Sequence, residues 1–167
     1  MRLLGAVLLW ISLIYAGVIY STKLNKRITL LEETIMMFEE MKILLEYLNT
    51  PVYDLVNITR DKDYFRNLKF LHLCCNYLKK GEDFPDAWKN AIDESATMYM
   101  TQEKERLLQL GENLGTSNKE GQMKILNMQI VSFEDFLQKA KHKRKKYAGT
   151  AKALGVLSGC MIFILAI

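Results

Sequence analysis

The side chains best suited to chemistry lie close together in the middle of the chain. His72 and Cys75 are three positions apart, so on a helix they share one face and could hold a metal ion or serve an enzyme. A structural zinc site normally needs four ligands, and no second cluster of histidines and cysteines supplies the others. A small sulfur-bearing core residue beside a half-buried histidine fits the sequence better. We therefore predict no metal, no cofactor and no enzymatic activity.

A second candidate motif is the glycine-containing run from Gly111 to Gly115. It lacks the lysine and the preceding strand of a phosphate-binding loop. We predict instead that Gly111 permits a close contact between helices and that Gly115 ends a helix. The numerous carboxylates show no distinctive pairing. They are predicted to form a solvated surface, part of which could dock a basic partner.

Charge is distributed unevenly along the 167 residues. All nineteen acidic residues lie between Glu32 and Asp135, whereas residues 3–20 and 153–167 carry no charge. Residues 28–138 hold twelve Lys or Arg against nineteen Asp or Glu, a net charge of −7. The excess of basic residues lies next to the uncharged stretches, at Lys23, Lys26, Arg27, Lys139, Lys141, Lys143, Arg144, Lys145 and Lys146. This arrangement is not that of a nucleic-acid surface.

The uncharged stretches have the length of membrane spans. Residues 3–20 are predicted to form a transmembrane helix, because 18 residues without a charge are about the minimum that crosses a hydrocarbon core of roughly 30 Å. The alternative is a cleaved signal peptide, but the sequence ending at Ser21 is a poor cleavage site. Residues 147–167 are predicted to be a second transmembrane helix, with Lys152 reaching back to the lipid headgroups. Its alternative is a helix buried within the protein.

The basic residues also predict the orientation in the membrane. Both clusters lie on the side of residues 24–146, and the positive-inside rule therefore places this central domain in the cytoplasm. The three cysteines, Cys74, Cys75 and Cys160, form no disulfide framework, which agrees with a reducing compartment.

The central domain reads as an all-α bundle of about six antiparallel helices between the two transmembrane helices. Apolar residues recur every three or four positions from Leu24 to Leu48, where Thr50 is predicted to cap the next helix and Pro51 to occupy its first position. Three further short helices follow, one of them carrying Tyr64 inward. Ser117 and Glu120 are predicted to form the capping box of a last helix that runs without a break into the final segment. The long first and last helices are expected to pair.

Small residues recur at every fourth position of the final segment, at Ala151, Gly155 and Gly159. Such a stripe lets another helix approach closely within a membrane. Its partner would be the first helix near Ala16 and Gly17, or another subunit, and a chance pattern is the third alternative.

Several local strings, in this order and spacing, resemble the stage III sporulation protein AB family of endospore-forming bacteria. They are Leu3-Leu4-Gly5-Ala6, Thr50-Pro51, Trp88 soon after Gly81, Leu110-Gly111-Glu112-Asn113-Leu114-Gly115, and Leu154-Gly155. The resemblance covers essentially the whole chain and carries no catalytic signature.

This resemblance implies a specific role. Proteins of this family belong to a set that is made in the mother cell during engulfment. They are thought to build a channel-like complex between the mother cell and the forespore. Its central domain is similar to the cytoplasmic domain of platform proteins in type II secretion and type IV pilus machines, which dock a hexameric ATPase. The implied protein is a non-enzymatic platform in the mother-cell membrane around the forespore. Its implied partners are membrane lipid, other membrane subunits and an ATPase like stage III sporulation protein AA.

Two rival hypotheses remain open from the sequence. One is a membrane-anchored helical adaptor or regulator of another membrane-associated enzyme. The other is an enzyme that uses His72 and Cys75.

Overall fold

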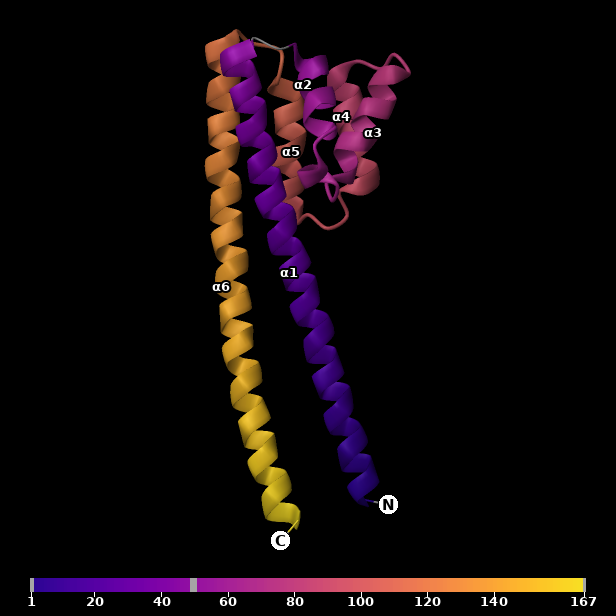
Figure 1. The fold of residues 1–167 in the computed structure, drawn as a ribbon, viewed down its shortest axis with the longest axis vertical. Coiled ribbons are helices and arrows are strands. Elements are labelled where there is room, and N and C mark those ends of the chain that lie inside the picture. The colour runs from indigo at the N-terminus through magenta and orange to yellow at the C-terminus, as the bar shows by residue number, and fades with distance from the viewer. Residues whose placement is uncertain (1, 49–50, 167) are drawn as a thin grey trace. The chain divides into compact units, whose positions relative to one another are not determined.

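The computed structural model describes the backbone of residues 2–48 and 51–166, and the side chains of residue 15, residues 18–47 and residues 51–147. In this part of the chain the regular structure consists of six α-helices and one short 3-10 helix, without strands (Figure 1). The helices are α1 (Arg2–Leu48), α2 (Val52–Arg60), η1 (Asp63–Phe65), α3 (Lys69–Lys79), α4 (Phe84–Ser95), α5 (Thr101–Asn113) and α6 (Lys119–Ala166). The predicted all-α class is confirmed.

The chain divides into two compact units. Met1–Ile28 and Gln138–Ile167 form one unit, which we call the terminal helix pair, and Thr29–Leu137 form the other, which we call the helical domain. Helices α1 and α6 each contribute to both units, because neither helix is interrupted. The expectation that the last helix runs on into the final segment is therefore met.

The terminal helix pair joins α1 to α6 in antiparallel order. The rings of Tyr20 and Tyr147 meet edge to face, with centroids 4.9 Å apart. Further along, the Nη1 atom of Arg144 donates a hydrogen bond of 3.2 Å to Oδ1 of Asn25. As the residue number rises along α1 it falls along α6, so the two helices run in opposite directions.

No helical stretch among the described residues is both long and apolar enough to cross a membrane. The segments predicted to do so, residues 3–20 and 147–167, lie largely outside the residues whose side chains the structure describes. The side chains of Ala151, Gly155 and Gly159 also lie outside the described part of the chain. For Thr50, neither the backbone nor the side chain is described.

Within the helical domain, α1 and α6 again pack side by side. Phe38 and Phe133 are both fully buried, and their rings meet edge to face with centroids 5.2 Å apart. At the end of the domain, Nζ of Lys119 donates a hydrogen bond of 2.6 Å to the backbone carbonyl of Glu46. The spacing of three and four residues on α1 places Leu31, Phe38 and Leu45 on one buried face, and this is the reason the helix packs as it does.

Trp88 is the centre of the packing between α3, α4 and α5. Its ring is fully buried and meets Phe70 of α3 edge to face at 5.3 Å. Its Nε1 donates a hydrogen bond of 2.8 Å to the backbone carbonyl of Leu107 on α5. Gly111, one turn further along α5, leaves room for the ring, since a Cβ atom added there would lie 2.2 Å from Cδ1 of Trp88. The indole therefore fixes the distance between α4 and α5.

The third predicted helix begins differently from our expectation. Residues 63–65 form the 3-10 helix η1, and α3 starts only at Lys69. The tighter turn directs Phe65 into the core and leaves Tyr64 71% exposed, so the prediction of an inward Tyr64 is wrong. The cause lies in the sequence order Tyr-Phe, because burying the wholly apolar ring avoids burying a hydroxyl group.

The contact between Gly111 and Trp88 leads to a first prediction. Gly111→Ala should lower the free energy of unfolding by about 1–3 kcal/mol, although alanine is the better helix former, because the added methyl group overpacks the site. Chemical unfolding of the full chain, followed by circular dichroism, measures the change. Gln109→Ala on the exposed face of α5 is the control and should shift stability by less than about 0.5 kcal/mol. A Gly111→Ala chain as stable as the control would contradict the close contact.

Candidate docking surface

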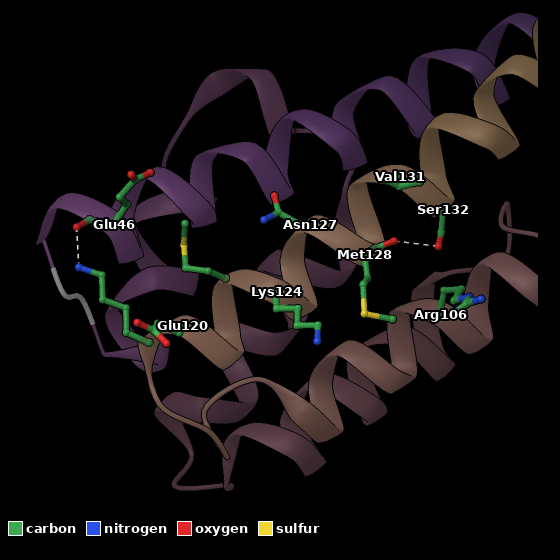
Figure 2. A pocket seen from close by; sticks show the side chains of 10 residues that line it. Glu46, Arg106, Glu120, Lys124, Asn127, Met128, Val131 and Ser132 are labelled. Carbon is green, nitrogen blue, oxygen red and sulfur yellow. Dashed lines mark hydrogen bonds between the residues drawn. The ribbon is translucent and has the colours of Figure 1, made fainter.

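An open groove runs along α6 in the helical domain, with a volume of about 890 Å³ (Figure 2). We call it the α6 groove. It is lined by Glu46 of α1, Arg106 of α5 and a run of α6 residues, namely Lys119, Glu120, Met123, Lys124, Asn127, Met128, Val131 and Ser132. The surface is therefore built by α1 together with the consecutive helices α5 and α6.

The start of α6 is fixed by Asn118, not by Ser117. Oδ1 of Asn118 accepts a hydrogen bond of 3.0 Å from the backbone amide of Gly121. Oγ of Ser117 is buried and has no hydrogen-bond partner among the described atoms. The predicted capping box of Ser117 and Glu120 is thus wrong by one residue, because asparagine caps a helix at least as well as serine. Glu120 lies in the first turn of α6, exposed on the α6 groove.

Two other predicted structural residues lie where chain segments meet. Gly115 follows α5 with a φ of +89°, a left-handed conformation that suits glycine, and it approaches Val52 at the start of α2. Pro51 lies one position before the helix that it was expected to start, since α2 begins at Val52. Its carbonyl accepts a hydrogen bond of 2.9 Å from the amide of Leu55.

The α6 groove combines exposed apolar side chains with basic ones. Met128 is 55% exposed and Val131 is 65% exposed, which is high for apolar residues on a packed helix. Arg106 and Lys124 are exposed and form no ion pair within the described part of the chain. In Figure 2, Lys124 and Met128 project from α6 towards the side on which Arg106 of α5 lies. The groove therefore offers apolar surface flanked by available positive charge.

A second, more polar groove adjoins the first and shares Arg106 and Ser132 with it. It has a volume of about 420 Å³, and its additional polar residues include Glu105, Gln109 and Asp135. Compared with this neighbouring groove, the α6 groove therefore has more apolar and more basic residues in its lining.

The remaining surface of the helical domain is mostly acidic. Some carboxylates form ion pairs, such as Asp93 with Lys104 at 2.8 Å and Asp63 with Arg66 at 2.9 Å. Others are exposed without such a pair among the residues that the structure describes, including Asp54, Asp86, Glu105 and Glu112. These free carboxylates make the domain suited to a basic partner.

The structure separates His72 from the two cysteines beside it. His72 is exposed, not half-buried as expected, whereas Cys74 and Cys75 are fully buried. Burial raises the pKa of Cys74 to about 12. Burial also raises the pKa of Cys75, although the charge of nearby Arg60 acts in the opposite direction. Both thiols are therefore protonated at neutral pH, and a thiol acts as nucleophile or metal ligand only as the thiolate.

A metal site finds no support elsewhere in the described residues, where no group of three or more His, Cys, Asp or Glu side chains is arranged to hold an ion.

The predicted basic residues next to the terminal segments lie on the surface. Lys23, Lys26, Lys143, Arg144, Lys145 and Lys146 are exposed, and Arg27 is half-buried. Of these, Arg144 bonds to Asn25 across the terminal helix pair.

A family model described as Stage III sporulation protein AB (spore_III_AB) matches residues 2–167. No curated protein sequence and no solved structure gives a significant match to the chain. The matched family is not known as a family of enzymes.

The cap of α6 leads to a second prediction. Asn118→Ala should destabilise the chain by about 1 kcal/mol, because the amide of Gly121 loses its acceptor. Ser117→Ala should be neutral or slightly stabilising, because its buried hydroxyl has no partner to lose. Thermal unfolding of the two variants beside the unchanged chain gives both values. The reverse order of stabilities would restore Ser117 as the capping residue.

The buried thiols lead to a third prediction. In a Cys160→Ser background, Cys74 and Cys75 should react with iodoacetamide only slowly in the folded chain, and rapidly after unfolding. An added Tyr64→Cys, at an exposed position, should react fast and serves as control. The unfolded thiol ionises near 9.0 and folded Cys74 near 12, so stability should fall as the pH rises between these values. Fast alkylation of the folded chain at neutral pH would refute the burial of both thiols.

Proposed function

The chain belongs to the stage III sporulation protein AB family, and we propose that in sporulation it acts as a non-enzymatic membrane platform that docks a cytoplasmic ATPase. The ATPase would be of the kind of stage III sporulation protein AA. The platform would join it to the membrane subunits of a channel-like complex between mother cell and forespore.

Anchorage in the membrane rests on the chain ends. Helices α1 and α6 continue without interruption into residues 3–20 and 153–166, which carry no charged side chain. Exposed basic residues precede or follow these stretches on the side of the helical domain. Under the positive-inside rule this arrangement supports a cytoplasmic position of the helical domain, where an ATPase would have access to it.

The observation that carries the docking role is the excess of exposed carboxylates on the helical domain. Residues 28–138 hold nineteen acidic against twelve basic residues, and several of the carboxylates have no ion pair among the described residues. A surface of this kind attracts a basic partner and favours rapid association. We therefore expect the docking face of the ATPase to be basic and the complex to depend on ionic strength.

A fourth prediction tests this role. The full chain, extracted in mild detergent, should co-purify with its ATPase in low salt, and the complex should dissociate as salt rises. The Debye length falls from about 10 Å at 0.1 M salt to about 3 Å at 1 M, which screens pairing between exposed charges. Sucrose of equal osmolarity is the control and should leave the complex intact.

Charge reversal on α5 sharpens the test. The double variant Glu105→Lys and Glu112→Lys should weaken the complex, while Lys89→Glu on α4 should not. No complex at low salt would refute the docking role. A complex with a different membrane-associated enzyme would favour an adaptor.

A further inference from the structure

The helical domain carries a second exposed apolar surface, which lies on α1. Met36, Ile43 and Tyr47 are 44%, 49% and 76% exposed. They lie seven and four positions apart and therefore share one face of the helix. Glu39 is exposed three positions after Met36 and has no ion pair among the described residues. We call these four residues the α1 stripe, an apolar surface with negative charge.

The α6 groove has the complementary character. It exposes Met128 and Val131, flanked by the available positive charges of Arg106 and Lys124. It contains three basic residues and two acidic ones, although the helical domain as a whole is acidic. An occupant of this groove should therefore be a helix that presents apolar side chains together with carboxylates, and the α1 stripe is such a helix face.

We propose that the helical domain associates with a second copy of this chain, the α1 stripe of one copy packing in the α6 groove of the other. The stripe and the groove are both exposed within one chain, so they do not cover each other there. Contact between them therefore requires another copy. Glu39 would lie near Arg106 or Lys124 of the second copy, and Ile43 near Met128.

The charges give this contact its specificity. Two copies with net negative domains repel each other in most orientations. The α6 groove is a locally positive exception, so the orientation that brings the α1 stripe to it is the one in which unlike charges meet. Burial of Met36, Ile43, Met128 and Val131 then supplies the apolar part of the contact. The association is independent of ATPase docking, which we place on the acidic surface.

Crosslinking between two distinguishable copies tests the contact. One tagged full-length chain carries Ile43→Cys and a differently tagged chain carries Met128→Cys, both in a Cys160→Ser background. In membranes containing both chains, a short bis-maleimide should link the two tags. A pair with Tyr64→Cys in place of Ile43→Cys is the control, since Tyr64 is more exposed than Ile43 but lies outside the α1 stripe. Linkage no stronger than in the control would overturn the proposal.

A charge exchange separates this contact from association through other surfaces. Lys124→Glu on the Met128→Cys chain should lower the crosslinking yield about tenfold, and Glu39→Lys on the Ile43→Cys chain should restore it. Lys89→Glu, an exposed reversal on α4, is the matched control and should have no effect. An unchanged yield with Lys124→Glu, an equal loss with Lys89→Glu, or no restoration by Glu39→Lys would each overturn the proposal. The chain with Lys124→Glu should still bind the ATPase. A failure of the self-association proposal can therefore be distinguished from a failure of the proposed ATPase docking.

Discussion

The antiparallel packing of α1 against α6 is the contact on which the rest of the helical domain depends. It joins the first and last helices through buried rings at Phe38 and Phe133 and closes at the domain end with Lys119 and the carbonyl of Glu46. The buried faces of both helices point into the core, and their exposed faces carry the α1 stripe and the α6 residues of the α6 groove. The surfaces that we assign to binding are thus a consequence of how the core is formed.

Helices α3, α4 and α5, which lie between α1 and α6 in the sequence, pack against one another in a different way. Around Trp88 the packing uses one large ring, one hydrogen bond to the carbonyl of Leu107 and one missing side chain at Gly111. Size complementarity of this kind fixes the distance between helices closely, because protein interiors leave few voids and tolerate little overlap. The face of α5 opposite this contact is thereby held beside α6, where Arg106 reaches the groove.

The sequence predicted the structure correctly where a residue type suits only one structural role at its position. The recurrence of apolar residues every three or four positions predicted α1, and Gly111 and Gly115 stand at a close approach and at a left-handed turn. The prediction failed where neighbouring residues compete for one role, as with Ser117 and Asn118 at the cap or Tyr64 and Phe65 at the core. The α6 groove could not be predicted, because Glu46, Arg106 and Lys124 come from three helices and their proximity depends on the fold.

The distance along the chain between Phe38 and Phe133 has a consequence for biosynthesis. Helices α2 to α5 contact their neighbours in sequence, α2 with α3, α3 with α4 and α4 with α5, and these contacts can form soon after the helices leave the ribosome. The part of α1 that packs against α6, including Phe38, can be covered only after α6 has been translated. During that interval the apolar side chains around Phe38 lack their final cover, and a nascent chain in this state is exposed to aggregation or to capture by chaperones.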